Sequence, residues 1–137
     1  MQIGFKFEKL TKSEANELGS ITLAFVGDAV YSLYVRTKNS IGHTLRSGAL
    51  NEKTSRTVCA VNQAKLADLL IPHFTEDELA VYKRARNTKK PSKSKHSTVS
   101  EYNKSTGLEA VIGYLYLTGE SDRLQFILEF GDNLNEG

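Results

Sequence analysis

The sequence has few of the features that mark secreted or membrane proteins. Its single cysteine, Cys59, excludes an internal disulfide bond and favours a reducing compartment, and we expect Cys59 to be a small core residue. No apolar run approaches the roughly 18 residues of a transmembrane helix. The first residues also lack the basic-then-apolar order of a signal peptide. These absences predict a cytoplasmic protein that has no membrane partner.

Several chemical signatures are missing as well. The three histidines have no metal-ligand spacing, and the sequence contains neither a glycine-rich phosphate loop nor a suggested Ser/His/Asp arrangement. The alternating apolar and polar residues of β-strands are nearly absent, whereas apolar residues recur with the 3.6-residue period of helices. With 39% apolar and 25% charged residues, the composition is that of an ordinary globular protein. We therefore expect a single all-α domain over residues 1–137.

The apolar period and the helix-terminating residues predict five or six helices. Thr75 and Glu78 form a capping box, which marks the start of a helix. Pro72 ends the preceding helix, and Gly119 is placed to end a later one. The expected helices cover about residues 13–18, 21–38, 51–71, 75–87, 102–117 and 121–130.

Two acidic residues stand among apolar neighbours in the two most apolar stretches of the chain. Asp28 follows Gly27 in LAFVGDAVYSLYVR, and Glu109 precedes Gly113 in GLEAVIGYLYL. A glycine inside a helix costs roughly 1 kcal/mol relative to alanine, and an ionised carboxylate taken from water costs far more unless it is paired. If the two helices pack together, the glycines permit close backbone approach and the carboxylates converge.

Converging carboxylates suit a hard divalent cation such as Mg²⁺, which takes oxygen ligands from one or two carboxylates, waters and substrate phosphates. Such an ion would compensate the desolvated negative charge and activate a water near a phosphate. The alternative is structural. Each acid would then lie at the polar edge of its helix or would bond to a buried arginine or tyrosine.

The basic residues are concentrated in one segment. The chain has 18 basic and 16 acidic residues. Seven basic residues and no acid lie between positions 83 and 96: Lys83, Arg84, Arg86, Lys89, Lys90, Lys93 and Lys95. Without these seven, 11 basic residues stand against 16 acidic ones, so the remainder carries a net charge of −5.

This basic segment predicts a polyanionic partner. It is polar and interrupted by Pro91, which predicts a loop over about residues 86–99. Arginine side chains match phosphate geometry, and duplex RNA is recognised mainly through its backbone and 2′-hydroxyl groups, so such a loop suits an RNA duplex. The alternative is that the segment is only a solvated charged face.

Four stretches carry a resemblance to a known family. LAFVGDAVYSLYVR resembles the signature helix of the ribonuclease III family, and STGLEAVIGYLYL resembles the second catalytic helix of that family. KRARNTKK, RTVCAVNQA and the short length without a double-stranded-RNA-binding domain resemble the Mini-ribonuclease III subfamily in particular. The likeness covers roughly residues 20–130 and implies the helical bundle of a ribonuclease III endonuclease domain.

The resemblance also implies an activity, a cofactor and partners. It implies a homodimeric, Mg²⁺-dependent endoribonuclease that matures precursors of large-subunit (23S) ribosomal RNA and leaves 5′-phosphate and 3′-hydroxyl ends. By position, Asp28 and Glu109 match the catalytic, metal-binding acids. A ribosomal protein that presents the substrate is a further partner to test. The residues expected to contact RNA are Arg84, Arg86, Asn87, Lys89, Lys90, Lys93 and Lys95.

The sequence departs from longer members of the family at three acidic positions. Ile21, Ala24 and Thr106 stand where those members carry carboxylates. The number of metal ions in each site therefore stays open. Two other functions also stay open: a noncatalytic RNA-binding module, and a helical domain whose basic loop docks an acidic protein.

Overall fold

The computed structural model describes residues 5–41, 47–90 and 97–135, and within these ranges the chain forms helices and no strand. The all-α class predicted from the sequence is confirmed. No helix in these ranges combines the length and the apolar character needed to cross a bilayer. The elements are α1 (Lys12–Glu17), α2 (Ser20–Ser40), α3 (Ser47–Val58), α4 (Ala60–Leu70), the 3₁₀ turn η1 (Ile71–His73), α5 (Glu76–Asn87), α6 (Val99–Leu117) and α7 (Ser121–Asn135).

Threonine–glutamate capping boxes begin three of the helices. In each box the threonine hydroxyl accepts the backbone N–H three residues later, and the glutamate there accepts the N–H of the threonine. The box at Thr75 is the predicted one, and Gly119, at φ 73°, ends α6 as expected. The box at Thr98 starts α6 three residues before the predicted position. Such a cap contributes about 1 kcal/mol.

The stretch predicted to be one helix from residue 51 to residue 71 is two helices, α3 and α4. The chain is extended at Cys59 (φ −68°, ψ 156°), and this residue is exposed, so its predicted place in the core is wrong. Side-chain amides replace part of the helical ladder at the break. Asn62 Nδ2 donates to the carbonyl of Arg56, and Gln63 Nε2 donates to that of Val58 at 3.0 Å.

Helix α7 continues through Gly131, which was expected to end it. A Cβ atom at this position would lie 3.1 Å from a methyl carbon of Leu66 on α4. Gly131 is therefore placed where α7 packs closely against α4, and it does not terminate the helix.

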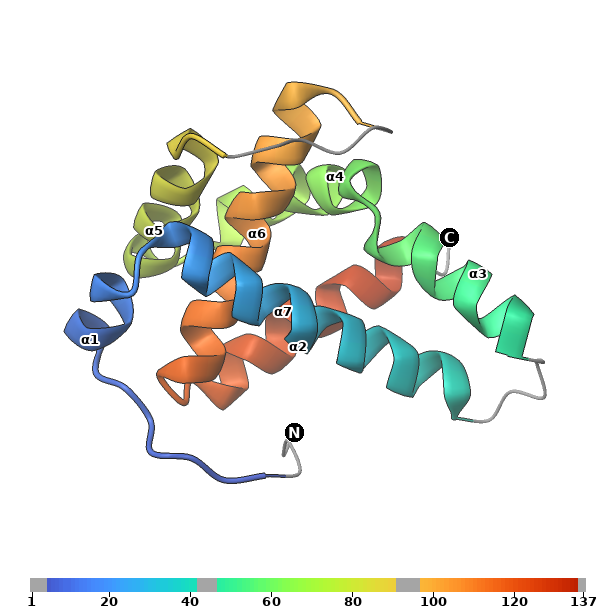
Figure 1. Cartoon of the computed structure of the whole chain (residues 1–137), viewed down its shortest axis with the longest axis horizontal. Helices are drawn as coiled ribbons and strands as arrows, with labels where there is room; N and C mark the ends of the chain where they lie inside the picture. Colours follow the sequence, from blue (N-terminus) through green and yellow to red (C-terminus); the bar gives the residue numbers. More distant parts are fainter. Residues whose placement is uncertain (1–4, 42–46, 91–96, 136–137) are drawn as a thin grey trace.

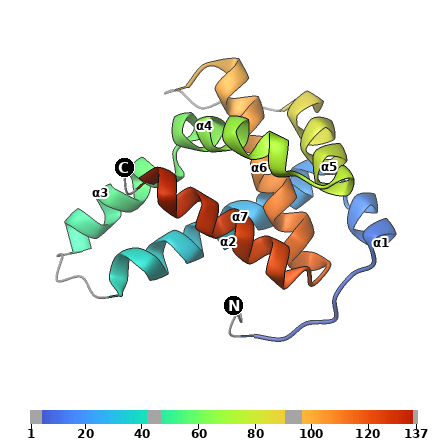
Figure 2. The ribbon, with the colours of Figure 1, turned by 180° about the vertical axis from the view of Figure 1, so that it is seen from behind.

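Helix α6 lies at the centre of the molecule. Residues 105–108 and 110–115 are all buried. Helix α2 crosses one side of α6 and makes the most extensive contact with it, as Figure 1 shows. Helices α4 and α7 lie on the opposite side, and α5 flanks α6 (Figure 2). The two helices predicted to pair around the acids are thus the central pair of the fold.

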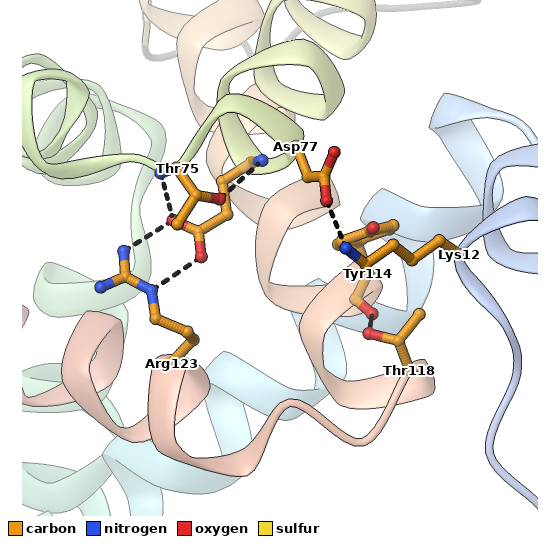
Figure 3. A network of polar contacts seen from close by, with 7 residues as sticks. Lys12, Thr75, Asp77, Tyr114, Thr118 and Arg123 are labelled. Atoms are coloured by element: carbon orange, nitrogen blue, oxygen red, sulfur yellow. Dashed lines mark hydrogen bonds and ion pairs between the residues drawn. The ribbon is translucent and has the colours of Figure 1, made fainter.

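A buried ion pair fixes α7 to α5. Glu78, which is 1% exposed, accepts hydrogen bonds from Arg123 Nε at 2.8 Å and Nη2 at 2.7 Å. Arg123 also donates to the carbonyl of His73 at 3.0 Å. Figure 3 shows this pair beside the exposed Lys12–Asp77 pair (2.6 Å) between α1 and α5. The buried, doubly bonded pair matters more for stability, because loss of one partner would leave the other charge buried and unpaired.

Candidate active site

Two glycines bring the backbones of α2 and α6 into direct contact. A Cβ atom on Gly27 would lie 1.7 Å from the carbonyl oxygen of Glu109. A Cβ atom on Gly113 would lie 2.0 Å from the carbonyl oxygen of Leu23. Neither clash can be relieved by turning a side chain, because both involve backbone atoms. The close approach predicted from the two glycines is therefore present, and it sets the distance between the helices.

The crossing brings Asp28 and Glu109 together. Asp28 immediately follows Gly27 on α2, and its carboxyl lies close enough to the carboxyl of Glu109 on α6 to raise the pKa of Glu109. Their surroundings differ, since Asp28 is exposed whereas Glu109 is largely buried. The sequence suggested that both acids would be desolvated. This is correct for Glu109 only.

Burial, followed by the neighbouring Asp28 carboxylate, raises the pKa of Glu109 from 4.5 to about 9. In the absence of a cation, Glu109 therefore holds a proton at neutral pH. A cation bound between the two side chains would replace that proton, because a cation also compensates the buried negative charge.

A third side chain reaches Glu109 from α4, and it was not among the residues predicted from the sequence. Gln63 is 2% exposed, and its neighbouring amide lowers the pKa of the Glu109 carboxyl. Its Oε1 is buried and has no hydrogen-bond partner in the described part of the chain. An unsatisfied buried acceptor typically costs about 1–3 kcal/mol. The sequence feature that could have predicted the burial of Gln63 is its spacing, which places it on the same helical face as Leu66 and Leu70.

The donor set at the crossing suits a hard divalent cation. Asp28 and Glu109 supply carboxylate oxygens, and the unpartnered Oε1 of Gln63 is a further oxygen acceptor beside them. Among the described residues, no group of three or more His, Cys, Asp or Glu side chains is placed to hold a metal ion. A cation bound by these residues would therefore complete its coordination shell with water or substrate oxygens.

Ile21, Ala24 and Thr106, where the resemblance implies acids in longer proteins, contribute no carboxylate. Ile21 is an exposed apolar residue on α2, and Ala24 is buried. Thr106 is buried on α6, and its hydroxyl donates to the carbonyl of Tyr102 at 3.0 Å. Of these positions and the two predicted site residues, only positions 28 and 109 therefore carry a carboxylate.

The basic residues predicted to contact RNA lie at the C-terminal end of α5 and just beyond it. Arg84 is exposed and donates to Asn16 Oδ1 at 3.2 Å, whereas Arg86 lies over the ring of Tyr82, 5.6 Å from its centroid. Lys90 has a structural role. Its Nζ donates to the carbonyls of Ala85 (2.7 Å) and Arg86 (2.8 Å) at the end of α5.

A groove of about 550 Å³ separates the end of α5 from the start of α6. Arg86, Asn87, Lys89 and Lys90 line one side of it, and Tyr102 lies on the other. Tyr102 is seven residues before Glu109, which places it on the same face of α6 and about 10 Å along the axis. Lys93 and Lys95 lie outside the described residues.

The sequence and the structure are similar to those of known proteins. A family model, the Ribonuclease III domain, matches residues 21–120. The Mini-ribonuclease 3 of Clostridium tetani is 36% identical over 133 residues, which are 96% of this chain and 88% of that protein. That of a Thermoanaerobacter species is 41% identical over 122 residues, covering 89% and 86%. A crystal structure of a Fusobacterium nucleatum protein matches with a TM-score of 0.74 and 30% identity, over 81% of this chain and 88% of that one.

Proposed function

The chain belongs to the ribonuclease III family, and on that premise we propose that it cleaves double-stranded or structured RNA at a centre formed by Asp28 and Glu109. Membership of this family makes the chain an endoribonuclease. One observation carries the assignment of the centre: the two carboxyls meet where Gly27 and Gly113 bring α2 and α6 into backbone contact.

The proposed cofactor is Mg²⁺, held by Asp28 and Glu109. When bound, the ion supplies Lewis-acid chemistry, activating a water and neutralising charge on the scissile phosphate. The chain positions the two ligands differently. Asp28 presents an exposed carboxylate to the substrate, whereas Glu109 lies beside Gln63 of α4. We propose that hydrolysis leaves a 5′-phosphate and a 3′-hydroxyl.

The proposed duplex contact is the groove beside α5. Arg84 and Arg86 carry planar donors that match phosphate oxygens, and the groove lies on the α6 face that also carries Glu109. An RNA duplex bound through its backbone would therefore pass along both sites. From the resemblance to the small subfamily, we propose that the substrate is a precursor of 23S ribosomal RNA in the cytoplasm. We propose a ribosomal protein as the partner that presents this substrate.

The proposed homodimer forms through α2. Ile21, Phe25, Ala29 and Leu33 are exposed and four residues apart, so they form one apolar stripe along the helix. Phe25 is 78% exposed, which is unfavourable for a large aromatic ring in water. A second copy of the chain that covers the stripe would bury these side chains beside Asp28.

The proposal is tested by cleavage of an end-labelled RNA duplex with Mg²⁺ or with EDTA. We expect cuts by the wild-type protein only with Mg²⁺, and a loss of at least about a hundredfold in rate for Asp28→Asn and Glu109→Gln with the fold retained. Glu52→Gln is the matched control, because it removes an exposed α3 carboxylate that pairs with the exposed Arg56. A wild-type rate for Asp28→Asn would remove this residue from the mechanism.

Binding is measured with the same duplex, to separate recognition from chemistry. Replacing Arg84 and Arg86 by alanine should weaken binding and reduce its dependence on salt, since fewer counterions are released. Asp28→Asn should still bind the duplex. An unchanged salt dependence in the arginine variant would contradict the role of α5, and duplex binding without any cleavage would instead favour a noncatalytic RNA-binding module.

A further inference from the structure

Gln63 on α4 is 2% exposed, and its amide lies close enough to the carboxyl of Glu109 to act on that group. It lies just after the break between α3 and α4. Its Nε2 donates to the carbonyl of Val58, the last residue of α3, at 3.0 Å. The amide of Gln63 therefore connects the break between α3 and α4 to the proposed catalytic centre.

A purely structural role accounts for only part of this arrangement. If Gln63 served only to satisfy α3, the bond from Nε2 to Val58 would be sufficient. Asn62 already makes the same kind of bond, from its amide to the carbonyl of Arg56. The contact with Glu109 and the buried, unpartnered Oε1 remain unexplained by that role.

The chemistry of Oε1 identifies what it lacks. A buried carbonyl oxygen needs a hydrogen-bond donor, and such groups are satisfied by protein or by ordered water in almost all structures. Asp28 and an ionised Glu109 are acceptors only, so neither can supply this hydrogen. Mg²⁺ in proteins commonly keeps several of its waters, and each bound water is a strong donor to a nearby oxygen.

We propose that Gln63 is a positioning residue of the catalytic centre: its amide holds the carboxyl of Glu109 beside Asp28, and its Oε1 accepts a hydrogen bond from a water on the bound cation. This inference rests on the proposed function, because it takes Asp28 and Glu109 to be the cation's ligands. Gln63 touches no substrate atom and acts through Glu109 and that water.

The test compares Gln63→Met and Gln63→Leu with the matched variant Asn62→Leu. Each variant loses one amide-to-carbonyl bond at the α3–α4 break, and the Gln63 variants also lose the contact with Glu109. The first readout is the affinity for Mn²⁺, a spectroscopic substitute for Mg²⁺, measured by electron paramagnetic resonance without RNA. The second is the Mg²⁺ concentration that gives half-maximal cleavage, and the third is the melting temperature.

We expect both Gln63 variants to bind Mn²⁺ on the order of tenfold more weakly and to need correspondingly more Mg²⁺, since partners of metal ligands tune affinity to this extent. Their melting temperatures should fall no further than that of Asn62→Leu, because each variant removes one amide donor from a backbone carbonyl at the α3–α4 break. Asn62→Leu should keep wild-type metal affinity. Two Gln63 variants let the test survive a folding failure in one of them.

Several outcomes would overturn the inference. Wild-type Mn²⁺ affinity in the Gln63 variants would do so while leaving the proposed function intact. An equal loss of affinity in Asn62→Leu would show that the α3–α4 break matters and not the contact with Glu109. If the wild-type protein bound no Mn²⁺ and Asp28→Asn cleaved RNA normally, the proposed function and this inference would both fail.

Discussion

At the scale of single residues, Glu109 has the least favourable surroundings for the charge it must carry. It is largely buried, it faces Asp28, and together these raise its pKa to about 9. Only the Gln63 amide acts in the opposite direction. The metal-free protein therefore keeps a proton on Glu109 that the unfolded chain would release well below neutral pH.

The first prediction follows from this difference. The folded pKa of Glu109, about 9, exceeds the unfolded value of 4.5, so the stabilising contribution is complete below pH 4.5 and is lost as the pH rises through 9. Glu109→Gln has no ionisable group at this position, so its free energy of unfolding does not fall for this reason as the pH rises. The variant should gain stability over the metal-free wild type between these pH values, by at most about 1.4 kcal/mol per pH unit. Urea unfolding in EDTA at several pH values measures the gap.

Glu52→Gln provides the control for this measurement, because Glu52 is exposed and its pairing with Arg56 is solvent-screened. Its stability should follow that of the wild type across the same range. A gap between Glu109→Gln and the wild type that stays constant with pH would contradict the assignment of the raised pKa.

The sequence pointed to Asp28 and Glu109 as candidate residues, but it did not point to Gln63, the α4 side chain beside Glu109. Asp28 and Glu109 were identifiable because each is a charge in an apolar helix beside a glycine. Gln63 was not, because a neutral amide in an amphipathic helix is common, and its contact with Glu109 depends on how α4 packs. The structural role of Lys90 was hidden for the same reason, since seven basic residues in one segment look alike until the end of α5 is placed.

At the scale of secondary-structure elements, the crossing of α2 and α6 is the feature that locates the centre. Backbone atoms meet at Gly27 and Gly113, so the separation of the helices does not depend on how side chains between them pack. Asp28 and Glu109 therefore lie where the backbones of the two helices touch. This placement suits a centre whose ligands must keep their geometry.

The second prediction concerns these glycines. Gly27→Ala should lower the free energy of unfolding by on the order of 3 kcal/mol, because the added methyl group would overlap the carbonyl of Glu109. Gly48→Ala is the matched control, since a Cβ atom there meets nothing within 4 Å and Gly48 lies within α3. It should be neutral or stabilising by up to about 1 kcal/mol. Denaturant unfolding of both variants gives the comparison, and equal stabilities would contradict the close crossing.

Most elements were predictable because their apolar period and caps agree. Helices α2, α5 and α6 lie near their expected positions, and the Thr75 box and Gly119 mark ends that follow from local chemistry. The break at Cys59 was missed because nothing in its neighbourhood forbids a helix. The extension of α7 past Gly131 was missed because packing against Leu66, a distant residue in the sequence, decides the role of that glycine.

At the scale of the whole molecule, the exposed apolar stripe on α2 is the surface that we propose a second copy of the chain covers. Phe25 lies at its middle and is the most exposed large apolar side chain in the described ranges. Because the stripe runs beside Asp28, the partner surface and the proposed catalytic centre are neighbours. Oligomeric state and activity should therefore change together.

The third prediction is that Phe25→Asp converts a dimer into a monomer, since a desolvated carboxylate on each side of the interface would be strongly unfavourable. Sedimentation equilibrium measures the molecular mass directly. Leu69→Asp is the control: Leu69 is also exposed and apolar, but it lies on α4, away from the stripe. A monomeric wild type, or a dimer that persists in Phe25→Asp, would contradict this interface.

The ion pair between Glu78 and Arg123 also affects when the chain can fold during its synthesis. Glu78 both caps α5 and needs Arg123, which the ribosome adds 45 residues later. Until then, burying Glu78 would leave its charge without a partner, and α5, with Arg84 and Arg86, would have no stable place in the structure. We therefore expect the groove beside α5 to form only after Arg123 has been added, at a point where Glu109 on α6 is already part of the chain.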